Sequence, residues 1–469
     1  MRLQRVRSRY VIVAVALSSL MIGCARDSTG PGSNLSPGAR LAFVVQPTFV
    51  TMGTTIAPSV RVAVQDSLGA TIATDSSRVA VALVPKGNGA TLSGTTVQRA
   101  SSGIATFNDL SVNVADSNYQ LVASVTAGPT ATSVRFSVIP ALKMISSIYS
   151  ACALTAGGSA YCASNPFFER TPADSDVIPS LVPGLTFSSV VGSGGTNCGV
   201  TSSGAAYCWG SGSGGVLGNG DTLDSATPVP VSGGLTLSTV SQWGYTTCGL
   251  TTAGTAYCWG LFALGNGTTQ PSNVPTAVGG GLTFSSLSVG YNFVCGITKA
   301  NAAYCWGDPR MGELGGPTTA ANDYGLLPVA VSGGLSFASV SAGWAQACGV
   351  ATDGKAYCWG TNQAGQLGTT ATDSVCNGTV PCSDVPVAVT GGFTFTAVGA
   401  GEDASCGLTT AGAVYCWGND KTSPWQITGL PPLVSLSVGG VEACGLTADG
   451  VGYCWDPYTT SDVARIRLY

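Results

Sequence analysis

Seven pairs of cysteines share one spacing, and this recurrence constrains the fold more than any other feature of the chain. Nine residues separate the two members of each pair, which are Cys152/Cys162, Cys198/Cys208, Cys248/Cys258, Cys295/Cys305, Cys348/Cys358, Cys406/Cys416 and Cys444/Cys454. The pairs recur at intervals of 38 to 58 residues. Repeats of this length are typical of propeller blades and solenoid turns. Residues 142–469 are therefore predicted to form seven structural repeats.

A turn signal lies between the two cysteines of every pair. The residue six positions after the first cysteine is Gly158, Gly204, Gly254, Asn301, Gly354, Gly412 or Gly450. Gly and Asn tolerate a positive φ, so this position fits the last loop residue of a three-residue hairpin with a bulge. The hairpin places the two cysteines opposite each other, at a separation suited to a disulfide. We predict one disulfide per repeat and a further one between Cys376 and Cys382, in an insertion of the fifth repeat.

The alternative for so many cysteines is zinc, which the spacing disfavours. Each C-x9-C pair lacks the short ligand spacing of zinc knuckles and has no third or fourth ligand nearby. The chain has no histidine, which excludes imidazole bases, metal ligands and proton shuttles. With 65 glycines and only 9% charged residues, it favours short strands and tight turns over solvated helices. We expect an all-β protein with no metal and no cofactor.

The N-terminus predicts export. Residues 1–23 combine four arginines with a short apolar run, as secretory signals do, and end in Met21-Ile22-Gly23 before Cys24. This resembles the lipobox of bacterial lipoproteins, which implies lipidation of Cys24, a flexible tether over residues 24–40 and anchoring in the cell envelope. A plain signal peptide or an N-terminal membrane anchor is the alternative. Removal of residues 1–23 leaves 15 basic and 23 acidic side chains, a net charge of −8, so a nucleic-acid partner is not expected.

Residues 41–140 show a different pattern, in which apolar and polar residues alternate. Val60, Val62 and Val64 form one such run, with turn residues on both sides. A period of two is typical of half-buried strands, and several such strands predict a β-sandwich. The segments 62–69 and 103–110 resemble bacterial Ig-like domains of the invasin type. The resemblance implies a spacer or adhesive stalk.

The C-terminal repeats resemble those of the regulator of chromosome condensation family. The resemblance is carried by Tyr207-Cys208-Trp209-Gly210 with Gly215-Val216-Leu217-Gly218, and it recurs at 357–360 and 365–368. It implies a seven-bladed β-propeller with four-stranded blades. Family members catalyse guanine-nucleotide exchange and bind chromatin, and neither role suits an exported acidic chain. A secreted bacterial propeller that inhibits β-lactamases through aromatic loop residues is the more relevant analogue, and it implies protein binding.

The candidate binding site lies in a short turn before the first cysteine of each repeat, where the residues vary. We predict that these turns form one rim with an aromatic arc next to an acidic arc, because equivalent positions in a propeller lie on a ring. The candidate rim residues are Trp243, Tyr245, Tyr291, Phe293, Trp344, Gln346, Glu402, Asp403 and Glu442. By contrast, the tryptophans of the Tyr-Cys-Trp motif are expected to pack between blades rather than to form a sugar-stacking ring.

Three classes of function follow from these residues. The favoured function is binding of an extracytoplasmic protein that the sequence does not identify. The alternative is binding of a glycan. The third is a polysaccharide hydrolase, for which Glu402, Asp403 and Glu442 are the only convergent carboxylates that the sequence offers. We expect no catalysis, since neighbouring surface acids often point apart. The Gly-rich loops lack the Lys-Ser/Thr of phosphate-binding loops and are interpreted as turns.

Overall fold

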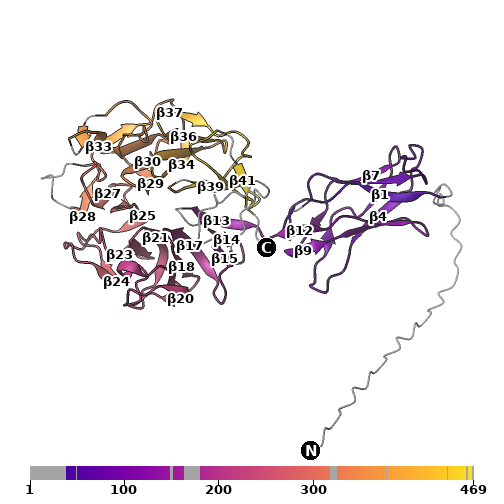
Figure 1. The fold of residues 1–469 in the computed structure, drawn as a ribbon, viewed down its shortest axis with the longest axis horizontal. Coiled ribbons are helices and arrows are strands. Elements are labelled where there is room, and N and C mark those ends of the chain that lie inside the picture. The colour runs from indigo at the N-terminus through magenta and orange to yellow at the C-terminus, as the bar shows by residue number, and fades with distance from the viewer. Residues whose placement is uncertain are drawn as a thin grey trace, which may run out of the picture.

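A computed structural model shows an all-β chain built from two units (Figure 1). It describes residues 38–48, 50–147, 151–162, 180–316, 325–372, 374–376, 378–440, 442–460 and 463–466. The signal segment and Cys24 lie outside these residues. Among them there is no α-helix, only the 3-10 turn Ser213–Gly215, and no helix suited to crossing a membrane.

The first unit, called the sandwich below, packs its two larger sheets around one apolar core. Two of its sheets are formed by β1 (Arg40–Val45), β3 (Val60–Gln65) and β7 (Ile104–Phe107), and by β11 (Thr130–Thr132), β10 (Leu121–Ser124), β4 (Arg78–Leu83) and β6 (Val97–Arg99). The smaller pairings join β2 (Val50–Thr51), β12 (Phe136–Ile139) and β9 (Asp116–Tyr119), and β5 (Leu92–Ser93) with β8 (Ser111–Val112). Val60, Val62 and Val64 are buried in the core, as their alternation predicts.

The second unit consists of seven successive antiparallel sheets, numbered here in chain order. Their first strands are β13 (Leu142–Ser147), β17 (Phe187–Ser193), β21 (Leu237–Trp243), β25 (Phe284–Val289), β29 (Phe337–Ala342), β34 (Phe395–Ala400) and β38 (Ser437–Val438). The second strands are β14 (Ala151–Thr155), β18 (Thr196–Thr201), β22 (Thr246–Thr251), β26 (Phe293–Thr298), β30 (Gln346–Ala351), β35 (Ala404–Thr409) and β39 (Ala443–Leu446).

Two further strands complete each sheet. The third strands are β15 (Ala160–Cys162), β19 (Ala206–Gly210), β23 (Ala256–Gly260), β27 (Ala303–Gly307), β31 (Ala356–Thr361), β36 (Val414–Gly418) and β40 (Gly452–Trp455). The outer strands are β16 (Ser180–Leu181), β20 (Ser225–Pro230), β24 (Ser272–Ala277), β28 (Gly325–Ala330), β33 (Val380–Ala388), β37 (Lys421–Gln426) and β41 (Val463–Arg465). The fifth sheet gains β32 (Ser374–Cys376), which pairs with β33.

The sheets are tied in a ring by the hairpin between their second and third strands. The hairpin residue with positive φ is the one that the cysteine spacing singles out, for example Gly204 at 86° and Asn301 at 62°. Its carbonyl accepts a hydrogen bond from the first strand of the next sheet, as in Leu237 N to Gly204 O at 2.8 Å. The same bond joins the last sheet to the first, from Leu142 N to Gly450 O at 2.9 Å.

All eight predicted disulfides are present. Seven of them join the second and third strands of one sheet, and they are Cys152–Cys162, Cys198–Cys208, Cys248–Cys258, Cys295–Cys305, Cys348–Cys358, Cys406–Cys416 and Cys444–Cys454. In each pair the cysteines face each other in the strand register, with Cα atoms 3.9 to 4.1 Å apart. Cys376–Cys382, the eighth bridge, joins β32 to β33. Each bridge therefore secures one sheet.

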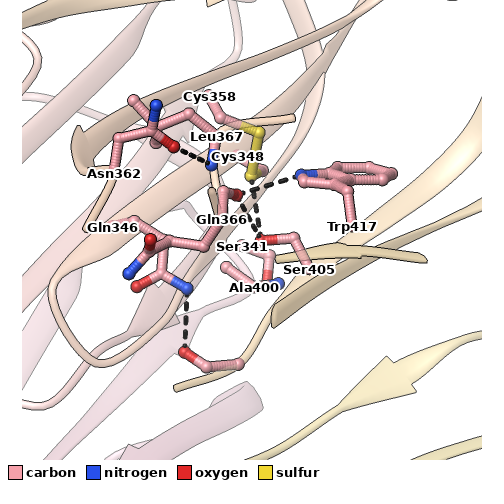
Figure 2. The surroundings of a disulfide bond; sticks show 11 residues. Ser341, Gln346, Cys348, Cys358, Asn362, Gln366, Leu367, Ala400, Ser405 and Trp417 are labelled. Atoms are coloured by element: carbon pink, nitrogen blue, oxygen red, sulfur yellow. Dashed lines mark hydrogen bonds between the residues drawn. A yellow bond between two sulfur atoms is a disulfide. The ribbon is translucent and has the colours of Figure 1, made fainter. Parts of the chain in front are cut away.

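The bridging cysteines of the third strands are buried in the ring, apart from the half-buried Cys162. Cys258, Cys305 and Cys416 are 0% exposed, and in the register they also face the outer strand of their sheet. Figure 2 shows the equivalent Cys348–Cys358 bridge beside the tryptophan of the next sheet, Trp417. The sequence predicts these cysteines as disulfide partners, and each of their bridges links two strands within one sheet.

The tryptophans pack between sheets, as predicted. Trp259 Nε1 donates to Val216 O at 2.8 Å, and the same bond joins Trp306 to Ala263, Trp359 to Glu313 and Trp417 to Gln366. In each case the acceptor precedes the Leu-Gly of a loop between the third and outer strands. A Cβ on the glycine of that Leu-Gly pair, Gly218 in the second sheet, would lie 2.6 Å from Trp259 Nε1. The Gly-x-Leu-Gly motif is thus a cradle for the next tryptophan.

Candidate functional site

One face of the ring carries both kinds of variable loop. The turn between the first and second strands and the loop between the third and outer strands meet there, because the carbonyl of Tyr245 accepts a hydrogen bond from Leu261 N at 2.9 Å. The same contact joins Asn292 to Asp308, and Asp403 to Asn419. We call this face the rim face and the first kind of turn the rim turn.

Neighbouring rim turns are fixed to each other through the backbone. Tyr291 N donates to Gly343 O at 3.0 Å, and Trp344 N donates to Gly401 O at 2.9 Å. The turns can approach this closely because each begins with glycine. A Cβ on Gly343 would lie 2.4 Å from Gly401 O. The variable side chains of consecutive sheets are therefore held side by side.

In the third to sixth sheets, the tips of the rim turns are the accessible part of the predicted rim. Tyr245, Trp344 and Asp403 are exposed, and Tyr291 and Glu402 are half-buried. These five side chains occupy the fourth and third positions before the first cysteine of their repeats, where the backbone reverses. They come from the third, fourth, fifth and sixth sheets, so they form a continuous arc.

The other four predicted rim residues are buried, which corrects their assignment to an accessible surface. Phe293, Gln346 and Glu442 stand two residues before the cysteine; the first two begin the second strand of their sheets, and Glu442 directly precedes β39. Trp243 stands five residues before its cysteine, at the end of β21, in the place that glycine takes in the next four sheets. The number of residues between a turn position and the following cysteine distinguishes the exposed tip positions from the buried positions. Closeness to the turn in the sequence does not distinguish them.

The aromatic half of the arc contains a stacked pair. The rings of Tyr291 and Trp344 lie 4.0 Å apart with an interplanar angle of 10°. Trp344 is 36% exposed and Tyr245 is 42% exposed. Phe262, in the neighbouring loop, is 40% exposed and accepts a hydrogen bond from Thr246 Oγ1 through its carbonyl. Sequence analysis missed Phe262 because its loop was interpreted only as a turn.

An apolar pocket of about 310 Å³ adjoins this aromatic sector. It lies between the third and fourth sheets, and its lining includes Leu261, Phe262, Leu264, Pro271 and Leu326. Thr268, Thr269 and Gln270 supply polar groups, and no charged residue lines the pocket in the part of the chain that the structure describes. The pocket is suited to apolar side chains of a partner.

The acidic half of the arc belongs to the sixth sheet and its neighbour. Although Asp403 lies at the surface, partial desolvation of its carboxyl raises its pKa, and charge repulsion from Glu402 and Asp420 raises it further. Burial raises the pKa of Tyr458 to about 12, and the negative charge of Asp403 contributes to this rise. Tyr458 donates its hydroxyl hydrogen to Gly440 O at 2.9 Å. Negative charge is thus concentrated at this part of the rim face.

The three carboxylates considered for catalysis differ in their exposure. Glu402 and Asp403 lie at a turn tip, whereas Glu442 is buried with Oε1 3.3 Å from Cys444 Sγ. Two groups of possible metal ligands occur among the described residues, Cys376-Cys382-Asp384 and Glu442-Cys444-Cys454. Both rely on cysteines that are joined in disulfides. They therefore offer no thiolate pair to a metal.

Comparison with known proteins identifies the repeats. Residues 284–313 and 337–366 match one sequence profile of the regulator of chromosome condensation (RCC1) repeat, and residues 203–242 and 353–408 match a second. The matches fall on parts of the second to sixth sheets of the ring. No curated protein matches the chain in sequence.

Solved structures share the fold. Prp20p, the RCC1 of the yeast Saccharomyces cerevisiae, has a TM-score of 0.53 at 18% identity, over 62% of this chain and 80% of its own. In its complex with Kap60 the score is 0.51 at 19% identity, over 62% and 78%. Human WBSCR16 has 0.54 at 16% identity, over 65% and 87%. The chain therefore contains RCC1 repeats in a propeller of the RCC1 type, and identities this low show the fold alone.

Proposed function

We propose that the seven sheets are the blades of a closed propeller that binds an extracytoplasmic protein through its rim face. The observation that carries the proposal is the partly exposed Tyr291–Trp344 stack, held by backbone bonds beside an apolar pocket and an acidic sector. Aromatic residues that a rigid scaffold presents at a surface are typical anchors of protein interfaces. Prp20p has binding properties toward Gsp1p and histones, so a propeller of this fold serves as a binding protein.

We further propose that the chain is exported and lipid-anchored through Cys24, with residues 41–140 as an Ig-like stalk. The eight disulfides support an oxidising compartment. Tyr119 supports the Ig-like assignment, because its hydroxyl donates to Val114 O at 3.1 Å, five residues upstream. This bond resembles the tyrosine corner of Ig-type sandwiches. Replacement of Cys24 by Ser should yield unprocessed protein without a lipid if Cys24 is the anchor.

A carbohydrate ligand is the second candidate. A stacked, solvent-facing aromatic pair offers the flat platform on which a sugar ring packs, and Asn292 at the neighbouring tip can hydrogen-bond a hydroxyl. The pocket favours the protein partner, since apolar side chains such as Leu261, Leu264 and Leu326 predominate in its lining.

The test compares the rim face with the opposite face. Envelope extract is passed over immobilised wild-type chain, Trp344→Ala, Tyr291→Ala and the control Val434→Ala, an exposed residue of the connection beside the Gly412 hairpin. We expect each rim variant to lose about 1 to 4 kcal/mol of binding free energy, seen as reduced capture of the partner, and the control to capture it as the wild type does. Equal capture by the wild-type chain and all three variants would exclude the rim face.

A further inference from the structure

The connection between the sandwich and the ring is two residues long. Strand β12 ends at Ile139 and β13 begins at Leu142, so Pro140 and Ala141 alone separate the two units in the chain. Proline fixes its own φ and confines the preceding residue to extended conformations. Ile139 and Leu142 are both buried. A flexible linker would instead be exposed and rich in Gly and Ser. The connection therefore has the composition and burial of a rigid joint.

Backbone hydrogen bonds hold both sides of this connection. On the sandwich side, Met52 N donates to Ile139 O at 2.7 Å. On the ring side, Ala156 N donates to Ala141 O at 3.0 Å. The torsions between these two bonds are those around Pro140, and the proline ring fixes one of them. The connection therefore leaves the two units little freedom to reorient.

The hairpin of the seventh sheet packs directly against the connection. Leu142 N donates to Gly450 O at 2.9 Å, and Gly450 has a φ of 78°. A Cβ at Gly450 would lie 2.9 Å from the Ala141 Cβ and 2.7 Å from Leu142 O, so this approach requires glycine. A pocket of about 240 Å³ lies between this part of the ring and the sandwich. Both units line it, with Thr51, Thr54 and Thr55 of the sandwich and Pro431, Thr447 and Asp449 of the ring. The units therefore share an interface beyond the connection itself.

This interface lies at the face of the ring opposite the rim face. Within each sheet the rim turn joins the first and second strands, whereas the hairpin joins the second and third strands at the other end. Gly450 and Ala156 both belong to such hairpins. Figure 1 shows the sandwich beside the ring, with β9 and β12 nearest to it. Tyr245 and Trp344 of the rim turns are exposed in the whole chain. The sandwich therefore leaves these side chains open to a partner.

We infer that the sandwich and the ring form one rigid body, in which the interface at Pro140 and Gly450 fixes the direction of the rim face relative to the sandwich. This inference goes beyond the proposed function, since it concerns how the binding face is held and not what it binds. A hinge at the connection would let the rim face take many directions, whereas the rigid interface presents it in one. A partner that contacts both units meets them already oriented, which reduces the entropy lost on binding.

The test uses the full chain with spin labels at Val134 of the sandwich and Leu223 of the ring, which are 52% and 71% exposed. The labels enter as noncanonical amino acids, so that the native disulfides stay intact. Double electron–electron resonance measures the distribution of distances between the two labels. We expect a single narrow distribution for the native chain. Insertion of Gly-Ser-Gly-Gly-Ser-Gly between Pro140 and Ala141 should make the distribution at least about twofold wider.

The matched control places the same insertion between Gly333 and Gly334, in an exposed connection of the ring where a Cβ would meet no atom within 4 Å. This insertion should leave the distribution unchanged. A native distribution as wide as that of the Pro140 variant would overturn the inference, and so would a Pro140 insertion that changes nothing. Neither result affects capture through Trp344 and Tyr291, so the inference can fail while the proposed function holds. A narrow native distribution with equal capture by the rim variants would keep the rigid interface and overturn the rim face.

Discussion

The two units of the chain reach an all-β structure by opposite means. The sandwich buries one continuous apolar cluster and contains no cysteine, whereas the ring divides its interior into seven clusters, each containing half-cystines. Each ring cluster lies between two consecutive sheets. The sandwich therefore depends on the whole of its core. The ring depends on repeated local contacts, which leaves its turn tips free to vary, as in other repeat architectures.

Reduction of the disulfides should produce the largest difference in thermal stability between the two units. Closing an eleven-residue loop stabilises each sheet by about 3 kcal/mol in the chain-entropy model. A thiol reductant should therefore lower the unfolding temperature of the ring far more than that of the sandwich. Two transitions in calorimetry, with and without reductant, would show this. The isolated sandwich, residues 41–140, assigns its own transition. An unchanged ring transition after confirmed reduction would mean that the bridges add nothing to the contacts between sheets.

The second largest loss of stability should follow replacement of a tryptophan that the Gly-x-Leu-Gly loop of the preceding sheet binds. Trp359→Ala removes a fully buried ring and leaves Glu313 O without its donor, so we expect a loss of about 3 to 5 kcal/mol. The Phe replacements sharpen the comparison, because Trp455 Nε1 has no acceptor to lose among the described residues. Trp359→Phe should therefore cost about 1 kcal/mol more than Trp455→Phe in denaturant unfolding. A larger cost at Trp455 would contradict the role of the cradle.

The units should also respond oppositely to pH. Burial raises the pKa of Glu313 from 4.5 to about 8, while hydrogen bonds from Thr95 lower the pKa of Asp109 in the sandwich, as the contact with Lys86 does for Asp116. A raised acid pKa means that the folded ring binds more protons between pH 4.5 and about 8, so its stability falls as pH rises through that window. The lowered pKa values mean that the sandwich loses stability as pH falls.

Glu313→Gln isolates the ring's part of this response. Gln366 fills the same position in the next sheet, where Oε1 accepts from Ala364 N at 2.8 Å as Glu313 Oε2 accepts from Met311 N at 2.7 Å. The neutral variant should gain on the order of a few kcal/mol over the wild type at about pH 8.5 and little at about pH 4.5. Unfolding curves at both pH values measure it. A gain of equal size at both would assign the effect to packing.

The sequence predicted the strands and disulfides of the ring more accurately than the exposure of the rim residues. The cysteine spacing and Gly204-type turns determine register, so the hairpins, bridges and buried tryptophans were predictable from the sequence. The exposure of a turn residue depends on one step of register, which is why Trp243 and Phe293 were placed on the surface although they are buried. The pocket at Phe262 was not predictable, because it forms only where loops of two sheets meet.

The smallest expected effect concerns the stability of the rim itself. Trp344 is partly exposed and its ring contact is the stack with Tyr291, so Trp344→Ala should lower the free energy of unfolding by only about 0.5 to 1.5 kcal/mol, the value of an aromatic pair. Its backbone bond to Gly401 is kept by any residue. Denaturant unfolding measures the change, and Trp359→Ala is the buried comparison. If Trp344→Ala destabilised the ring as much as Trp359→Ala, the rim tryptophan would belong to the contacts between sheets, and its loss of binding would then report misfolding rather than a lost anchor.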